Sequence, residues 1–138
     1  MASTYIADSN VYISAANDPS FRERFEAFIF ANGPLEVSSV TVAEVLIGIR
    51  DHVQHGRAVQ ALVAGTVLSA PSPEDWIVAG STMARLGGDA VTKGRSFWND
   101  ALLASQCASV GATLVTTNTA DFRRLARYIP VKVVAPFP

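Results

Sequence analysis

The sequence predicts a single α/β domain over residues 1–138, with a mainly parallel sheet of four to five short strands flanked by helices on both faces. Two observations support this fold class. The strand-like runs are short, apolar and rich in β-branched residues, which is typical of strands inside a parallel sheet. Stretches with the apolar spacing of helices separate these runs, and that alternation favours parallel crossover connections. Strands are expected over 4–7, 35–40, 114–117 and 132–135, with a strand end at 67–68.

The first half of the chain contains clear start and stop signals for helices. Pro19 suits the first turn of a helix over 20–31, and Gly33 lies in the stretch that ends it. Thr41 is expected to cap the next helix, because Glu44 follows it at the spacing of a capping box. Further helices are expected over 11–16, 57–64 and 74–86.

One stretch organises the second half of the chain, and it consists of a helix, a buried strand and a turn into another helix. Ser96 is expected to cap the helix, which Gly111 ends. The stretch 89–95 before this helix is expected to be a loop. After the strand, residues 118–121 form a turn that leads into a last helix over 122–128.

The composition is that of a globular intracellular protein. Of its 138 residues, 49% are hydrophobic and 17% are charged, which argues against disorder. The single cysteine, Cys107, excludes a disulfide framework and fits a reducing compartment, so a cytoplasmic location is expected. We expect no signal peptide and no membrane span. The net charge of −1 argues against a protein that coats nucleic acid through bulk positive charge.

Four acidic residues are expected to meet at one edge of the sheet. Asp8 follows the first strand and Asp121 follows the strand over 114–117, and parallel strands end at the same edge. Glu44 and Asp100 are expected early in helices whose N-termini point to that edge. Each acid alone is explained equally well as a helix cap or a solvent-facing charge. Four acids at one edge are harder to explain as four separate caps.

Such a cluster predicts a metal site. Two like charges separated by roughly 4 Å repel by about 4 kcal/mol at an effective dielectric constant of about 20, so protons or cations must intervene. Carboxylate, amide and hydroxyl oxygens without paired cysteine or histidine suit Mg²⁺ or Mn²⁺ better than zinc. A metal-loaded acidic edge is typical of phosphodiester or phosphoryl-transfer chemistry.

Four sequence blocks resemble the signature blocks of the PIN-domain nucleases, and in particular the VapC-type ribonuclease toxins of bacterial and archaeal toxin–antitoxin modules. The resemblance extends over essentially the whole chain. Each block alone is a weak signal, whereas four in this order and at these separations are fairly specific. The blocks are 8–11, 44–48, 100–104 and 116–122.

The resemblance implies a role for each matching residue. The acidic quartet would hold Mg²⁺ or Mn²⁺, and three polar residues would orient these ligands or their waters. It also implies an RNA substrate, a homodimer and a cognate antitoxin that blocks the site. The acidic quartet is Asp8, Glu44, Asp100 and Asp121, and the polar residues are Asn10, Thr117 and Asn118.

Binding of RNA requires positive charge beside the acidic centre. Five basic residues flank the last two acids of the quartet, and their proximity favours contact with RNA over an ordinary role as solvated helix charges. They are Lys93, Arg95, Arg123, Arg124 and Arg127.

Other functions that use acids at a sheet edge fit less well. A phosphoacceptor receiver domain or a haloacid-dehalogenase-type phosphatase needs a pair of acids after the first strand, and only Asp8 is present there. The stronger alternative is a catalytically silent PIN fold that binds protein or RNA. Retention of all four acids argues against it, because a binding module has no need of carboxylates that repel one another.

Overall fold

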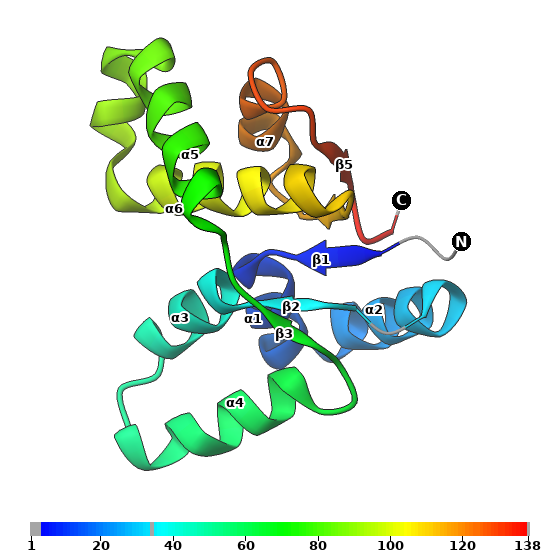
Figure 1. The fold of residues 1–138 in the computed structure, drawn as a ribbon. Helices are drawn as coiled ribbons and strands as arrows, with labels where there is room; N and C mark the ends of the chain where they lie inside the picture. The colour runs from blue at the N-terminus through cyan, green and yellow to red at the C-terminus, as the bar shows by residue number, and fades with distance from the viewer. Residues whose placement is uncertain (1–3, 34, 138) are drawn as a thin grey trace.

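The computed structural model describes residues 4–33 and 35–137, and the side chains of 88–96 lie outside the described set. Its helices alternate with five short strands (Figure 1). The strands are β1 (Tyr5–Ala7), β2 (Val37–Ser38), β3 (Leu68–Ser69), β4 (Thr113–Val115) and β5 (Lys132–Val134). The α-helices are α1 (Ser9–Asn17), α2 (Pro19–Asn32), α3 (Ser39–Ile47), α4 (His55–Val63), α5 (Pro73–Leu86), α6 (Gly88–Val110) and α7 (Thr119–Leu125), with a short 3₁₀ helix η1 (His52–Gln54).

All the strand pairings are parallel. One sheet has the order β1-β4-β5, and β2 pairs with β3 beside it. A parallel bridge between Ile6 and Glu36 joins the two, where the Glu36 N–H donates to the Tyr5 carbonyl at 2.9 Å. The predicted parallel sheet of short strands is therefore confirmed.

Helices cover both faces of the sheet, as predicted. Successive strand residues point to opposite faces, and the two cores reflect this alternation. Ile6 and Leu114 belong to the core that includes α6 and α7, whereas Ala7 and Val115 belong to the core that includes α1 and α2. Figure 1 shows α5, α6 and α7 on one side of β1, with α1 to α4 on the other. No helix in the described part of the chain has the length and apolarity that a membrane span requires.

The expected capping box at Thr41 was wrong. The helix begins earlier, because the Ser38 side chain accepts the N–H of Val40 at 3.1 Å. This cap also shortens the strand expected over 35–40 to β2. Thr41 is buried and donates its hydroxyl to the Ala7 carbonyl at 2.9 Å, so it fastens α3 to the end of β1. Glu44 consequently lies in the middle of α3.

Two further helix boundaries differ from the prediction. The helix expected to start at Ser96 begins at Gly88 and includes the stretch expected as a loop. A single glycine inside it, Gly94, costs only about 1 kcal/mol relative to alanine, which a helix of this length tolerates. Asp100 therefore lies inside α6 instead of near its start. Likewise α7 begins at Thr119, so Asp121 lies in its first turn. The expected stop at Gly111 is confirmed, with φ of 72°.

A buried polar network fixes α6 against β2 and β3. Gln106 on α6 accepts the Ser38 hydroxyl at 2.6 Å and donates to the Ser69 hydroxyl at 2.8 Å. Because Ser38 also caps α3, this network sets the position of α3, and with it of Glu44, relative to α6.

Candidate functional site

Asp8 is the centre of the candidate site. It directly follows β1 and caps α1, and only 2% of it is exposed. Its Oδ1 accepts the N–H of Val11 at 3.3 Å, and its Oδ2 accepts the hydroxyl of Thr116 at 2.6 Å. The N–H of Asn10 also hydrogen-bonds to the carboxylate. Both carboxylate oxygens are thus held in fixed directions.

Burial raises the pKa of Asp8 above its ordinary value of 3.8. The hydrogen bonds from Thr116, Val11 and Asn10 act in the opposite direction and stabilise the charged form, but desolvation is the larger effect. A buried carboxylate whose charge is only partly compensated is a site where a cation binds favourably.

A chain of hydrogen bonds connects Asp8 to Asp121. The Thr116 hydroxyl, which donates to Asp8, accepts the N–H of Asn118 at 2.9 Å. The Asn118 side chain in turn donates its Nδ2 to Asp121 Oδ2 at 3.1 Å. This hydrogen bond is compatible with the supporting role expected of Asn118, which stays a prediction. The connection runs through Thr116, while Thr117 is exposed, and the supporting role given to Thr117 stays a prediction.

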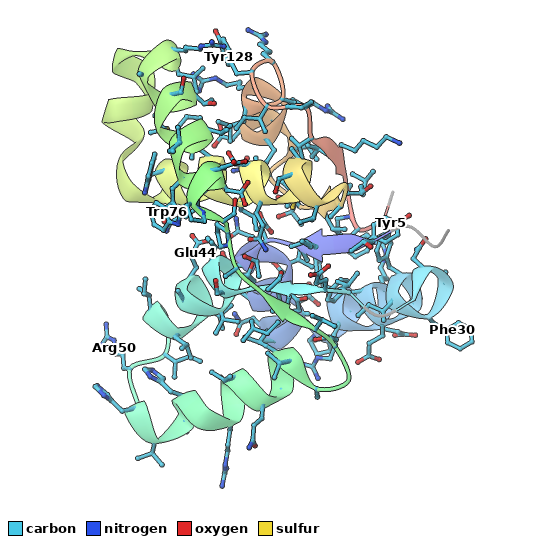
Figure 2. The ribbon with its side chains drawn as sticks, in the orientation of Figure 1. Tyr5, Phe30, Glu44, Arg50, Trp76 and Tyr128 are labelled. Atoms are coloured by element: carbon cyan, nitrogen blue, oxygen red, sulfur yellow. The ribbon has the colours of Figure 1, made fainter. Side chains whose placement is uncertain are left out.

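Glu44 approaches Asp8 from α3. Burial is the largest cause of its raised pKa, and the charge of Asp8 raises it further. Side-chain hydrogen bonds from Asn99 and Ser9 act in the opposite direction. Glu44 is labelled in Figure 2 between α3 and α6. Glu44 is thus close enough to Asp8 for the charge of Asp8 to raise its pKa, and such proximity is the first requirement of a shared cation site.

The fourth acid, Asp100, lies on α6 next to Asn99, the residue that contacts Glu44. Asp100 is partly exposed and takes part in an interaction within the fold. Among the described residues, no three histidine, cysteine, aspartate or glutamate side chains converge in a geometry that holds a metal ion. The structure therefore couples Asp8 with Glu44, and Asp8 with Asp121 through hydrogen bonds, without drawing all four carboxylates around one point.

The chemistry of these side chains fits a divalent cation with oxygen ligands. The carboxylates of Asp8, Glu44 and Asp121 are supported by hydroxyl and amide groups, and neither histidine nor the buried Cys107 is among the residues described at this site. Burial raises the pKa of Cys107 strongly, so its thiol stays protonated. Hard oxygen donors of this kind suit Mg²⁺ or Mn²⁺.

Sequence reasoning missed three residues that hold the acids in place: Thr116, Ser9 and Asn99. Thr116 could have been found from strand register, because β1 pairs Ala7 with Val115 and thereby sets the next residues, Asp8 and Thr116, side by side. Asn99 carries no comparable signal, since its contact with Glu44 depends on how α6 packs against α3.

The basic residues expected near the site are only partly described. Lys93 and Arg95 lie outside the described side chains. Arg123 and Arg127 are exposed, whereas the guanidinium of Arg124 lies 5.5 Å from the centre of the Phe97 ring.

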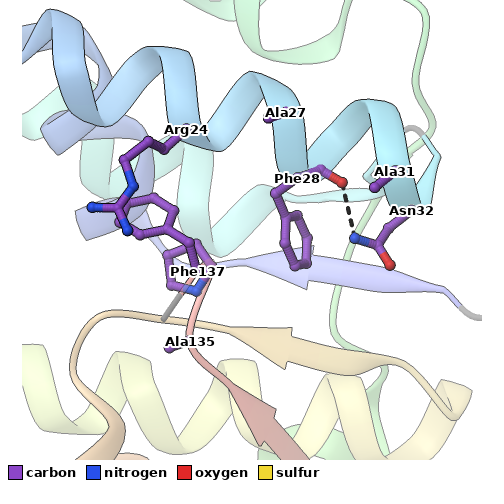
Figure 3. Close-up of a pocket in the computed structure, with 8 residues that line it drawn as sticks. Arg24, Ala27, Phe28, Ala31, Asn32, Ala135 and Phe137 are labelled. Carbon is purple, nitrogen blue, oxygen red and sulfur yellow. Dashed lines mark hydrogen bonds between the residues drawn. The ribbon is translucent and has the colours of Figure 1, made fainter.

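Two pockets differ in their relation to the acids. A pocket of about 230 Å³ opens beside Glu44, with Asn99 and Trp76 also in its lining. A larger pocket of about 640 Å³ lies between α2 and residues 135–137, where Arg24 covers the Phe137 ring (Figure 3). None of the candidate acids lines this second pocket.

Several solved structures share this fold. VapBC-1 from nontypeable Haemophilus influenzae is 21% identical, with a TM-score of 0.74 over 96% of this chain and 98% of that chain. VapBC2 from Rickettsia felis, bound to a promoter DNA fragment, is 21% identical, with a TM-score of 0.70 over 96% and 98%. A toxin–antitoxin complex from Klebsiella pneumoniae is 23% identical, with a TM-score of 0.63 over 97% and 98%.

Among curated protein sequences, none matches this chain. The sequence profile of the PIN domain, in contrast, matches residues 5–128, a span that includes all four predicted blocks and every strand except β5. The chain therefore belongs to the PIN-domain family, as its four sequence blocks predicted.

Proposed function

We propose that the protein is a metal-dependent endoribonuclease and the toxin of a type II toxin–antitoxin pair. The observation that carries this proposal is the buried Asp8 carboxylate, coupled electrostatically to Glu44 and linked by hydrogen bonds to Asp121. A PIN-domain protein that retains these acids near one another has the groups required for hydrolysis of a phosphodiester.

In this proposal the four acids, with Asp100 completing the set, hold Mg²⁺ or Mn²⁺. The bound cation supplies an activated water and stabilises negative charge on the leaving oxygen. The protein orients the ligands through hydrogen bonds to their carboxylates. Thr116 bonds to Asp8, Asn118 bonds to Asp121, and Asn99 bonds to Glu44. Such supporting hydrogen bonds fix the orientation of ligand side chains and are worth about 10- to 100-fold in metal affinity or activity.

RNA is the substrate that the surrounding charges favour. Arg123 and Arg127 are exposed on and just after the helix that carries Asp121, where they can neutralise phosphates next to the acidic centre. Arg124 extends the same basic run, and we assign Lys93 and Arg95 a similar role from the sequence alone.

The structural neighbours support an antitoxin partner. Two of those compared above are VapBC structures and the third is a toxin–antitoxin complex. We infer that this chain also pairs with an antitoxin, which covers the acidic site.

We further propose a homodimer. Ile47 and Ile77 are 72% and 71% exposed, and Trp76, which precedes Ile77 in the sequence, is half-exposed and lines a pocket together with Ile47. Light scattering should give twice the chain mass of 14.7 kDa, and Ile77→Arg should give a monomer. Val53→Arg, at another exposed apolar residue, is the control and should leave the mass unchanged. A monomeric wild-type protein refutes the dimer.

Cleavage of RNA is the decisive test of the proposed function. The purified chain should cut a mixed cellular RNA pool into discrete fragments in Mn²⁺ or Mg²⁺ and should be inactive in chelator. Asp100→Asn should lower the rate by about 100-fold or more while retaining the fold, because it removes a ligand charge. A well-folded, antitoxin-free protein that leaves the RNA intact would instead support the catalytically silent binding module.

The two adjacent threonines provide a matched test of the hydrogen-bond chain. Thr116→Val removes the hydroxyl that donates to Asp8 and should lower the cleavage rate by about 10- to 100-fold. Thr117→Val changes an exposed side chain by the same atoms and should lower the rate less than Thr116→Val does, because the hydroxyl that donates to Asp8 is that of Thr116. Equal losses in both variants would contradict the role given to Thr116.

The raised pKa of Glu44 predicts how stability depends on pH in chelator. Between the ordinary value of 4.5 and the raised folded value, the native state binds more protons than the unfolded state, so stability falls as pH rises through that interval. Glu44→Gln cannot ionise at this position and should therefore gain stability relative to wild type as pH rises above 4.5. Urea unfolding at several pH values measures this difference.

Two controls complete the pH experiment. Glu26→Gln, an exposed substitution on α2, should show no comparable gain at neutral pH. Added Mn²⁺ should raise the stability of wild type more than that of Glu44→Gln, because only the folded site gathers the ligands. A stability difference between Glu44→Gln and wild type that does not change with pH would contradict the raised pKa of Glu44.

A further inference from the structure

Positive charge is concentrated at the C-terminal end of the chain. From Phe122 to Pro138 the sequence has four cations and no acid, whereas the other seven cations and all twelve acids precede Phe122. A chain with net charge −1 therefore has one segment that is strongly basic. Such asymmetry is typical of a local surface that contacts the phosphates of nucleic acid.

The structure extends this basic segment to a second helix. Arg85, in the last turn of α5, places its guanidinium 6.0 Å from the centre of the Tyr128 ring. Arg85 is exposed, and Tyr128 remains 40% exposed in spite of this contact. We call this region the α7 basic surface, and it consists of Arg85, Arg123, Arg124, Arg127 and Tyr128.

The α7 basic surface begins at the acidic site and leads away from it. Asp121 lies in the first turn of α7, and Tyr128 follows seven residues later. Tyr128 lies three residues beyond the end of α7, in a turn where its N–H donates to the Leu125 carbonyl at 2.9 Å. Figure 2 shows Tyr128 at one end of the molecule and Glu44 near its middle, so the surface extends outward from the acids.

The chemistry of this surface fits single-stranded RNA. Exposed guanidinium groups neutralise phosphates without reading sequence. An exposed aromatic ring offers a stacking face to an unpaired base, a face that a base inside a duplex cannot reach. Arg85 places a cation near the Tyr128 ring, and Tyr128 nevertheless remains 40% exposed.

We propose that a single-stranded segment of RNA leaves the acidic site along α7, with an unpaired base stacked on Tyr128 and a phosphate bound by Arg85. This inference rests on the proposed function for its substrate, and it adds two contact residues and a direction for the RNA strand. Tyr128 and Arg85 are binding residues in this scheme and take no part in the chemistry at the acids.

Binding of a short fluorescent single-stranded RNA, measured by anisotropy in chelator so that no cleavage occurs, tests the proposal. Tyr128→Leu should weaken binding by about five- to hundredfold, the range typical of losing one stacked base, whereas Tyr128→Phe should bind like wild type. Arg85→Gln should weaken binding and reduce the slope of log affinity against log salt by about 0.7, the value for one phosphate contact on a single strand.

Matched controls use the same kinds of residue elsewhere on the surface. Arg57→Gln removes an exposed cation on α4, and Phe30→Leu removes a 94% exposed aromatic ring on α2. Both should bind RNA like wild type. Thermal melting of every variant checks that a loss of binding is not a loss of fold.

The outcomes separate this proposal from the proposed nuclease function. Wild-type affinity and salt slope in both Tyr128→Leu and Arg85→Gln overturn the RNA-binding role of these residues, even if the protein cleaves RNA. Equal affinity for duplex and single-stranded RNA overturns stacking on Tyr128. If the expected losses occur in a protein that cleaves nothing, the α7 basic surface is supported and the nuclease function is refuted.

Discussion

The candidate site depends on one buried carboxylate, that of Asp8. The parallel register that pairs Ala7 with Val115 brings Asp8 beside Thr116, where the two strands end. The Thr116 hydroxyl donates to one carboxylate oxygen and the first turn of α1 donates the Val11 N–H to the other. An ionised carboxylate buried without such donors would cost the fold several kcal/mol. Strand pairing, the start of α1 and the geometry of the site therefore form a single constraint, and none can change without the others.

A second acid, Glu44, lies near Asp8, and the repulsion between two ionised carboxylates lowers the stability of the fold. Glu44 is held near Asp8 by a chain of contacts that starts elsewhere: Gln106 binds Ser38, and Ser38 caps the helix on which Glu44 lies. Burial raises the pKa of both acids, and the charge of Asp8 raises that of Glu44 further. A fold selected for stability alone would separate these groups or replace one by an amide. Their proximity is best explained by a ligand that compensates both charges, which is the physical content of the metal proposal.

The parts that were predictable from the sequence are those governed by local patterns. Alternation of apolar strands and helices predicted the parallel sheet with both faces covered, and Gly111 ended its helix because only glycine adopts positive φ readily. The cap of α3 was misplaced because two candidates, Ser38 and Thr41, both fit a local rule, and the choice depends on a contact between Ser38 and Gln106, 68 residues away. Other features of the site also depend on contacts between distant segments, such as the hydrogen bond from Thr116 to Asp8, and local sequence patterns do not predict such contacts.

The charged residues of helix α7 are partly explained by the helix itself. Asp121 lies in its first turn and Arg123 and Arg124 lie in its last, and both placements are favourable in the field of the helix dipole, each by about 0.3–1 kcal/mol. These charges therefore stabilise α7 whether or not RNA is bound. The dipole does not explain why Arg85, on a different helix, lies over Tyr128, or why that ring stays exposed. Arg85 at the end of α5 and Tyr128 in the turn after α7 thus converge from two separate parts of the chain, and this convergence is the observation that favours the proposed RNA-binding surface over charges that serve only the stability of α7.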